Sequence, residues 1–489
     1  MNRWTSSVTR RSFLGYVGAG AATLGLAACG GTGSGGSASS PKPTNGASAK
    51  LPDWLASEAK QYKGRTLNVV ASQQYFKTTN EDFVNACKTF GDLTGTTINV
   101  SVINIDTGNI VTREDAAVKA GNPPDCAFVD AARFVSEFYQ LGDIVPVTDA
   151  VQQLESKYGA AHDVNKIYLQ LGSKKDWYGI PYFSLVNGYF SRKDWLDAKG
   201  IKQSEFDTYE KMRDVALEIS DPSQQRYGWG ITYNNSGDGN GFIERVLNSY
   251  GAAVADDSGT KVIFGKGSET KEAVTFISDI YTNSKYSKML APGIQSWNDT
   301  SNNEAWLAGT LGFTGNAFSL YAQSKSTGNP VYHETLLWNG PKGPAVKGPI
   351  NVPSSESFVI FKNAKEPGLA KVLAKYLPYG APLLQMVKDS VGLVLPAYTN
   401  IWTSDPYYLN GDPAYKPQHQ DLLQPLPIAT TTGLHFPQTP SPGTQAVDSS
   451  YVLSDMIGSI VSKKASVNDA ISTAKQRMMQ IFEQHGLTQ

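Results

Sequence analysis

The sequence of this 489-residue chain predicts an α/β fold. Three observations lead to that prediction. Between residues 67 and 129, stretches with strand character alternate with stretches of helical character. A second series of the same kind begins after Tyr189, and the length is sufficient for at least two domains. The composition, with 40% hydrophobic residues, 46 Gly and 26 Pro, is that of ordinary cores connected by many loops.

The first series predicts a parallel sheet. Residues 67–71 form a short apolar stretch that is typical of a buried strand. A capping-box pattern at residues 78–81 opens a predicted helix, and Gly95 ends it. A strand over residues 98–102, a helix over 113–120 and a strand over 126–129 complete the series. In this arrangement helices cover both faces of the sheet, and ligands bind beyond the carboxyl ends of the strands.

The second series is longer and less regular. Its last predicted helix begins with a capping box at residues 466–469 and carries an apolar stripe that runs from Ala470 to Ile481. The elements before it are a helix over 206–219, a strand over 227–233, a hairpin over 253–264, helices over 272–281 and 303–308, and a strand over 311–314.

Residues 9–29, TRRSFLGYVGAGAATLGLAAC, predict an export signal. Arg10 and Arg11 precede a charge-free run that is rich in Ala and Gly and too weakly apolar for a stable spanning helix. The pattern resembles a twin-arginine signal peptide over residues 1–28, and Leu-Ala-Ala-Cys at its end resembles a lipobox, in which Cys29 becomes the lipidated first residue. A buried N-terminal helix with a chance cysteine is the alternative.

Residues 29–63 are predicted to be a flexible, lipid-anchored linker, because their first part is almost entirely Gly, Ser, Thr and Ala. Removal of the signal takes three arginines and no acidic residue, so the formal net charge changes from −1 to −4. A mildly acidic chain without an excess of positive charge is not expected to bind nucleic acid.

The remaining cysteines are expected in the interior. Cys87 shares a helical face with Phe83 and Phe90, and Cys126 lies in an apolar run. Two buried thiols are the main interpretation; a disulfide between them is the alternative, because an exported compartment permits one. The five histidines are scattered without ligand spacing, so neither a metal site nor a cofactor is expected.

Several stretches resemble, in the same order, segments of the extracellular solute-binding proteins of bacterial ABC importers, family 1. The closest likeness is to the sugar-binding group related to maltose-binding protein. The resemblance covers nearly all of the chain from about residue 64. The stretches are FVNACKTFGDLTG (83–95), AGNPPDCAFVD (120–130), YGIPYFSLVNGYFSRKDWLDAKG (178–200), SWNDTSNNEAWLAGTLGFTGN (296–316) and KKASVNDAISTAKQRM (463–478).

The resemblance implies a two-lobe periplasmic-binding-protein-like fold with three crossovers between the lobes. Lobe one is expected at residues 64–183 plus 357–401, and lobe two at 187–353 plus 405–489. It implies that the protein captures an oligosaccharide in the interlobe cleft, closes on it by a hinge motion and delivers it to the permease subunits of an ABC transporter. We expect a monomeric lipoprotein, held by Cys29 at the outer face of the cytoplasmic membrane.

Candidate ligand residues are aromatic, amide or carboxylate side chains at predicted loop positions that the resemblance places at the cleft. Sugars stack their C–H faces on aromatic rings and require many hydrogen bonds to their hydroxyls. Trp297 is the best candidate for a stacking platform because it lies among polar residues. The full set is Gln74, Tyr75, Asp130, Tyr182, Phe183, Asn234, Asn235, Trp297, Asn316, Ser355, Glu356, Trp402 and Tyr451. For each of these, a loop, cap or packing role is the alternative.

Two other functions are considered. A secreted carbohydrate-active hydrolase would require catalytic groups. A serine hydrolase would need a Gly-x-Ser-x-Gly motif, which does not occur in the sequence, and a glycosidase would need two carboxylates in the cleft. The same fold could instead bind a peptide or another small solute. We expect a binding protein and no enzyme.

Overall fold

The computed structural model describes residues 50–104, 110–185, 187–350, 354–390, 393–410, 441–487 and 489. The predicted signal peptide, Cys29 and most of the predicted linker lie outside these ranges. Within them, no helix has the length and apolar character that a membrane span requires.

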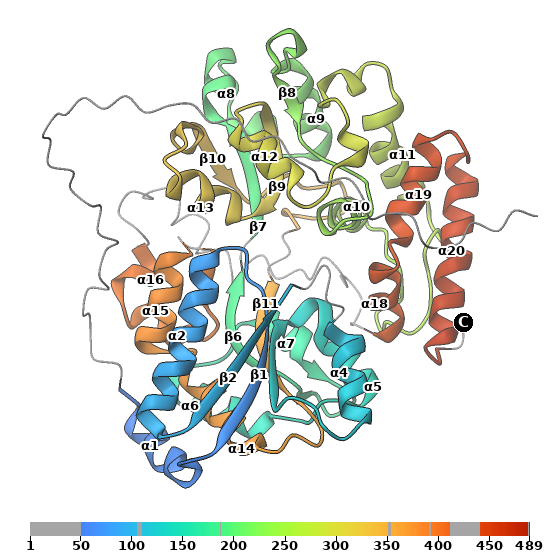
Figure 1. Cartoon of the computed structure of the whole chain (residues 1–489). Coiled ribbons are helices and arrows are strands. Elements are labelled where there is room, and N and C mark those ends of the chain that lie inside the picture. The colour runs from blue at the N-terminus through green and yellow to red at the C-terminus, as the bar shows by residue number, and fades with distance from the viewer. Residues whose placement is uncertain are drawn as a thin grey trace, which may run out of the picture. The chain divides into compact units, whose positions relative to one another are not determined.

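A six-stranded sheet organises the first core (Figure 1). Its strand order is β12-β6-β11-β3-β1-β2, with β1 parallel to both β2 and β3, as the alternating pattern predicts. The other three strands join antiparallel, so the sheet is mixed. The strands are β1 (Thr66–Ser72), β2 (Thr97–Ile103), β3 (Cys126–Asp130), β6 (Ile180–Leu185), β11 (Ser354–Ile360) and β12 (Val394–Pro396).

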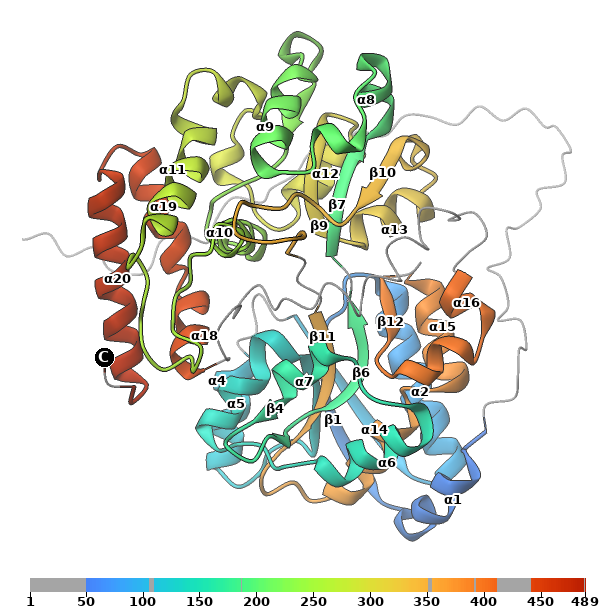
Figure 2. The same cartoon turned by 180° about the vertical axis from the view of Figure 1, so that it is seen from behind.

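Helices cover both faces of this sheet. In Figures 1 and 2, α2 and α15 lie on one side of it, and α4, α5 and α7 on the other. A short antiparallel pair, β4 (Gln170–Leu171) and β5 (Asp176–Trp177), follows α7. The helices are α1 (Asp53–Ala59), α2 (Lys77–Thr94), α4 (Ile110–Lys119), α5 (Ser136–Leu141), α6 (Thr148–Tyr158), α7 (Asp163–Leu169), α14 (Pro367–Tyr376), α15 (Gly380–Asp389) and α16 (Pro406–Asn410).

A four-stranded sheet, ordered β10-β7-β9-β8, organises the second core. Helices α19 and α20 complete this core beside α11 (Figure 1). The strands are β7 (Asn187–Arg192), β8 (Tyr227–Trp229), β9 (Leu311–Ala317) and β10 (Thr335–Trp338). The helices are α8 (Lys193–Lys199), α9 (Tyr209–Glu218), α10 (Gly237–Ser249), α11 (Ser268–Thr282), α12 (Ser301–Leu307), α13 (Ser319–Ser326), α18 (Pro442–Ser449), α19 (Val452–Val461) and α20 (Val467–Gln484).

The chain passes between the two cores three times. It leaves the first sheet after β6 and enters the second sheet with β7. It returns between β10 and β11, and after β12 it contributes α18 to α20 to the second core. The two-lobe α/β fold expected from the resemblance is therefore confirmed.

Several local predictions are corrected by the structure. The helix predicted to begin with a capping box at residues 78–81 begins at Lys77 instead. Thr79 lies within its first turn, where its Oγ1 donates to Phe76 O. The strand expected over 227–233 ends at Trp229, and the hairpin over 253–264 has a single bridge, Ala255 to Val262. By contrast, Ser466 caps α20 as predicted, by accepting from the backbone N–H of Asp469 at 3.2 Å.

The two cysteines are free and buried, so the alternative of a disulfide between them is wrong. Cys87 lies on α2 and Cys126 begins β3, and both side chains are 0% exposed in the first core. Burial raises the pKa of both thiols, which keeps them protonated and unreactive.

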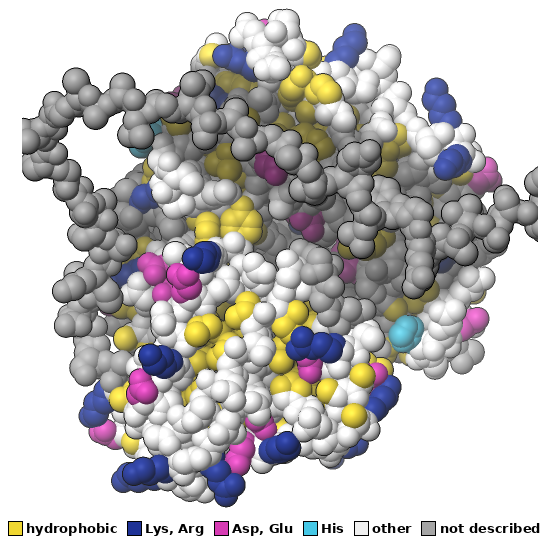
Figure 3. All heavy atoms as spheres, in the orientation of Figure 1, with side chains coloured by type: hydrophobic (Ala, Val, Ile, Leu, Met, Phe, Trp, Pro, Cys, Tyr) yellow, Lys and Arg dark blue, Asp and Glu magenta, His cyan; other side chains and the backbone are white. Residues whose placement is uncertain are grey.

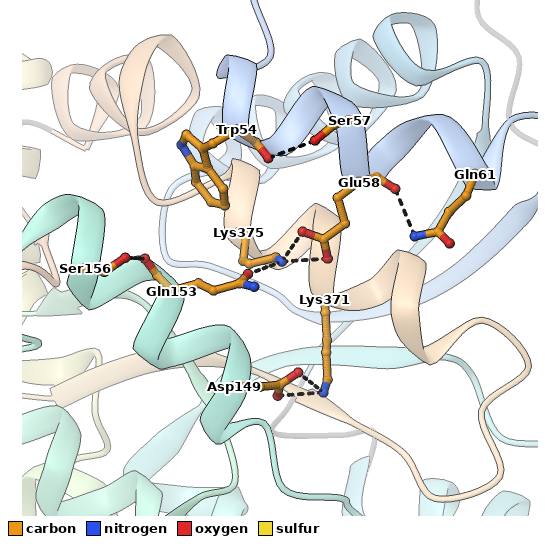
Figure 4. Close-up of polar contacts among 9 residues, drawn as sticks. All are labelled: Trp54, Ser57, Glu58, Gln61, Asp149, Gln153, Ser156, Lys371 and Lys375. Carbon is orange, nitrogen blue, oxygen red and sulfur yellow. Dashed lines mark hydrogen bonds and ion pairs between the residues drawn. The ribbon is translucent and has the colours of Figure 1, made fainter.

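The end of the predicted linker is folded. Residues 53–62 form α1 and the 3₁₀ turn η1 (Lys60–Tyr62), with Leu55 fully buried. Figure 4 shows how α1 is attached. Lys375 Nζ on α14 donates to both carboxylate oxygens of Glu58, at 2.7 and 2.6 Å, and to Gln153 Oε1 at 2.6 Å. The sequence offered no sign of this contact, because its partners are 317 residues apart.

Removal of the Glu58 carboxylate should destabilise the fold, because the Lys375 side chain is only 2% exposed and would keep a buried charge. We expect Glu58→Ala to lower the free energy of unfolding by about 2–3 kcal/mol, less than for a fully buried pair, because Glu58 is partly exposed. Urea denaturation measures this. The control is Asp149→Ala, which breaks the neighbouring, more exposed pair with Lys371 and should cost about 1 kcal/mol or less. Equal losses would contradict the assignment.

Candidate functional site

A pocket of about 400 Å³ lies between the two cores. The first core contributes residues from the end of β3, from the helical turn η2 (Ala131–Val135), from α5 and α7, and from the start of β11. The second core contributes the start of β7, one face of α10, α18, and Tyr451 directly before α19. The lining residues are Asp130, Phe134, Glu137, Tyr168, Asn187, Gly237, Asp238, Asn240, Gly241, Glu244, Arg245, Ser354, Gln445, Asp448, Ser449 and Tyr451.

The place of Asp130 follows from the parallel part of the sheet. β3 runs parallel to β1, and Asp130 is its last residue, so its carboxylate stands at the carboxyl end where α/β sheets bind ligands. Ser354, at the start of the antiparallel β11, donates from Oγ to Asp130 Oδ1 at 3.2 Å. The two strands therefore bring an oriented carboxylate to the pocket.

Helix α10 presents its polar face to the pocket. Ser236 caps it by accepting from the Gly239 N–H at 3.1 Å. Its apolar side chains, such as Phe242 and Val246, are buried in the second core. The residues at the pocket recur at helical spacing from Gly237 to Arg245. An added Cβ at Gly241 would meet only Arg245 Nη1, at 3.7 Å, so this glycine leaves open volume beside the carboxylates.

Tyr451 follows α18 and adopts φ 52°, in the left-handed region that a bulky side chain rarely occupies. Strain of this kind costs about 1–3 kcal/mol and clusters at ligand sites. Its position at the pocket agrees with the sequence prediction, as does that of Asp130.

Three asparagines form a second polar cluster next to the pocket. Asn316 Nδ2 donates to Asn302 Oδ1 at 3.1 Å and to Asn303, and Asn302 Nδ2 donates to Asp238 Oδ2 at 2.9 Å. Tyr75, from the loop after β1, joins this cluster across the boundary between the cores. Its hydroxyl accepts from Asn303 at 3.0 Å and donates to Gln323 Oε1 at 2.6 Å.

Two predicted site residues lie beside the pocket without lining it. Ser355 is 0% exposed and donates to Asn165 Oδ1 at 2.5 Å. Glu356 is 4% exposed and pairs with Asp130 in the sheet register. Both neighbour Ser354, so β11 carries consecutive polar residues past the pocket.

Other predicted residues lie in the cores, away from the pocket. Tyr182 and Phe183 are 0% exposed and pack with Phe128 in the first core, so their aromatic rings are structural. Trp402 is 8% exposed, and its Nε1 donates to His162 Nε2 at 2.8 Å. The structure thus gives these three side chains packing roles, because tertiary contacts cover both their ring faces and their polar atoms.

The remaining predicted residues are peripheral. Trp297 is half-buried against the second core, and its carbonyl accepts from Asn234 Nδ2 at 3.3 Å. Asn235 is exposed and donates to Asp455 at 3.1 Å. Gln74 donates from its side chain to Ser72 O at 3.3 Å, at the end of its own strand. None of them lines the pocket.

Sequence reasoning missed most of the pocket, above all the carboxylates on α10 and α18. Three glycines, at 237, 239 and 241, made the start of α10 look like a loop. Gly239 is required there, since an added Cβ would lie 2.3 Å from Asn234 O. A usable signal was present: Ser236 as a cap, followed by apolar pairs at 242–243 and 246–247, predicts a helix with its polar face opposite.

Two pocket carboxyl groups bind protons unusually tightly. Burial, and then the nearby Asp299 carboxylate, raise the pKa of Asp238 from 3.8 to about 7, against the opposing effects of Arg245 and the Asn302 amide. Burial, and then Asp448, also raise the pKa of Glu244 well above its ordinary value. With a pKa of about 7, Asp238 keeps its proton in weakly acidic solution and is then a carboxyl O–H donor among the acceptors of the pocket. Within the described residues, no group of His, Cys, Asp or Glu has an arrangement that could hold a metal ion.

An α/β fold of two lobes with a polar pocket between them defines the class of two-lobe solute-binding proteins. The chain belongs to the family of bacterial extracellular solute-binding proteins, whose model matches residues 71–377. No curated protein sequence matches this chain.

Solved structures agree on the fold. A solute-binding protein of an ABC transporter from Thermotoga lettingae, bound to α-D-tagatose, is 17% identical with a TM-score of 0.69; the match covers 86% of this chain and 100% of that one. The maltose-bound MalE3 of T. maritima is 16% identical with a TM-score of 0.67, covering 85% and 99%. Lmo0181 from Listeria monocytogenes, in complex with cycloalternan, is 12% identical with a TM-score of 0.67, covering 86% and 99%.

The raised pKa of Asp238 predicts a pH dependence of stability. Because the folded pKa of about 7 exceeds the unfolded one, the stabilising contribution of the protonated group is complete below about pH 4 and is lost as the pH rises through 7. Asp238→Asn should remove this loss, so we expect the ligand-free variant to gain about 1–3 kcal/mol over the natural chain between pH 5 and pH 8. Denaturation at both pH values measures it.

The control for this prediction is Asp92→Asn, which changes an exposed carboxylate on α2 and should follow the natural chain at both pH values. A stability difference for Asp238→Asn that stays constant between pH 5 and pH 8 would rule out a tightly held proton on Asp238.

Proposed function

We propose that this protein captures a sugar, of the oligosaccharide class, in the pocket between its lobes and delivers it to the permease of an ABC importer. One observation carries the proposal: the pocket of this member of the solute-binding family is lined by carboxylate, amide and hydroxyl groups. Hydrogen bonds to other polar groups fix the orientation of several of them. Dense, oriented hydrogen bonding of this kind suits a ligand covered with hydroxyls and rejects ligands that lack them.

The relatives support the proposal by analogy. The Thermotoga lettingae, T. maritima and Listeria monocytogenes proteins were solved with tagatose, maltose and cycloalternan, respectively, and all three share this fold. Asp130 and Tyr451 from the predicted set, together with Asn187, Asn240 and Gln445, are the ligand residues that we propose. Tyr75 and Asn316 would act from the neighbouring asparagine cluster.

The proposal includes that the sugar leaves the pocket chemically unchanged and that the body is a monomer. Incubation with oligosaccharides, followed by product analysis, tests the first point. Accumulation of cleavage products would favour the hydrolase alternative. A panel of mono- and oligosaccharides in a thermal-shift assay tests binding, because a bound ligand raises the melting temperature by mass action.

A side chain at position 241 should block the pocket without harming the fold. Gly241 lies on α10 with open space beside it, and replacement of a helical glycine favours the helix by up to about 1 kcal/mol. We expect Gly241→Leu to keep or raise the melting temperature and to weaken sugar binding at least about tenfold, the equivalent of about 1.4 kcal/mol. Calorimetry with the best sugar of the panel measures the affinity.

The matched control is Gly241→Ala, which gives the same gain in helix propensity but adds only one methyl group, and its affinity should stay near that of the natural chain. Unchanged affinity in Gly241→Leu would place the sugar elsewhere.

We also propose that the protein is exported and held at the outer face of the cytoplasmic membrane by a lipid on Cys29. Support comes from the twin-arginine pattern, the lipobox and the Gly/Ser-rich segment after it. Cys29→Ser should shift the protein from the membrane fraction to the medium. Fractionation and immunoblotting measure the shift, with Ser40→Ala as the control that stays with the membrane. A Cys29→Ser protein that remains in the membrane fraction would refute lipid anchoring.

A further inference from the structure

The pocket is far more acidic than the surface around it. Among the described residues, five carboxyl groups line it, on Asp130, Glu137, Asp238, Glu244 and Asp448, and Arg245 is the one cation. On the described part of the face in Figure 3, by contrast, basic and acidic side chains are interspersed. A concave site that gathers one sign of charge favours a ligand of the opposite sign.

Glu244 is the group that requires an explanation. Its side chain lies at the pocket but is 5% exposed, and its Oε2 has no hydrogen-bond partner among the described residues. The charge of the neighbouring Arg245 opposes the raised pKa of Glu244, but no ion pair joins the two within the described ranges, and the Arg245 Nε is itself unpartnered there. A buried carboxyl oxygen that is left without a partner is costly, so the position is favourable only when something in the pocket binds it.

Other carboxylates converge on the same place. Tyr168 lies at the pocket, 3% exposed, and its pKa is raised by burial and then by Asp130, Glu244 and Asp448, so all three carboxyl groups lie near its hydroxyl and line the same pocket. Two of them are held by protein donors: Asn240 Nδ2 donates to Asp448 Oδ1, and Ser354 Oγ to Asp130 Oδ1. These donors orient the two carboxylates beside Glu244.

We propose that the solute carries a protonated amine, which binds Glu244 in the pocket with the carboxylates of Asp448 and Asp130 beside it. This inference rests on the proposed function and narrows its substrate class to amine-bearing sugars. An ammonium group brings up to three N–H donors and a full positive charge, which matches an unpartnered carboxylate in an acidic site. A neutral hydroxyl would satisfy the hydrogen bond of Glu244 and leave the excess negative charge in place.

The arrangement of the pocket carboxylates favours an amine over a metal ion as the bound cation. Within the described residues the pocket carboxylates do not form a group that could coordinate a metal. They are instead spread over four elements, β3, α5, α10 and α18. The test therefore compares organic solutes that differ in their amino groups.

Three disaccharides with the same linkage make the comparison: the β-1,4-linked glucosamine dimer, its N-acetylated form and cellobiose. Calorimetry at pH 6, where the amines are protonated, should give at least about tenfold tighter binding for the free amine than for the other two. Equal or tighter binding of either neutral sugar overturns the inference but leaves the sugar-binding function intact.

Spermidine, an amine without hydroxyls, separates the two hypotheses further. Binding of spermidine with no binding of any sugar supports the amine site and refutes the sugar-binding function. If neither the glucosamine dimer nor spermidine binds, the amine inference is wrong, whatever the neutral sugars do.

Glu244→Gln keeps the shape of the side chain but cannot release a proton to become the carboxylate that pairs with the bound ammonium group, so we expect it to weaken binding of the glucosamine dimer about tenfold to a hundredfold. Glu218→Gln, on the exposed end of α9, is the matched control and should bind as the natural chain does. Asp448→Asn provides a second variant if Glu244→Gln does not fold, as melting curves will show. Undiminished binding in the folded variants overturns the assignment.

Discussion

The site depends on one constraint: around the pocket, strands and helices bury their apolar residues in the core of their own lobe, so the polar ends of β3 and β11 and the polar face of α10 meet at the boundary. β3 delivers Asp130 to that boundary, and β11 delivers Ser354 beside it. From the other side, α10 arrives with its apolar face already buried in the second core. A cavity between two closed cores is consequently lined by groups that form hydrogen bonds, which is the chemistry a hydroxylated solute needs.

Helix α10 combines three features in one short segment. Glycines at its start allow close approach of the backbone to Asn234 and leave space at position 241. Carboxyl groups at 238 and 244 face that space, and apolar side chains on the opposite face anchor the helix. Because the helix is fixed by packing, its carboxyl groups are held in place even though burial makes them harder to ionise.

Besides the three chain crossings, direct contacts join the two lobes. Tyr75 follows β1 of the first sheet, yet its hydroxyl bonds to Asn303 on α12 and Gln323 on α13. The bond to Asn303 is partly buried, and the bond to Gln323 is exposed to solvent. An apolar cluster also spans the boundary, with Phe190 and Trp306 from the second lobe and Leu395 from the first. Polar contacts and this apolar cluster together therefore hold the two lobes beside the pocket.

Local patterns in the sequence were sufficient to predict the parallel strands, the N-terminal cap and apolar stripe of α20, and the burial of the two cysteines. The end of a predicted strand located Asp130, whereas the family resemblance located Tyr451; both line the pocket. The resemblance also led us to expect Tyr182 and Phe183 at the cleft, but tertiary packing with Phe128 buries both rings in the first core. Local patterns failed for α1, whose anchor is 317 residues away.

What the sequence by itself determined, then, is the order of elements, the family and the chemical types of residue that stand at strand ends. Only the tertiary structure decided which carboxyl groups meet. Asp130, Glu244 and Asp448 lie on three elements far apart in the chain, and each alone resembles an ordinary surface acid. Their proximity, and the absence of a partner for Glu244 within the described residues, arise from packing between elements, which short-range periodicity does not encode.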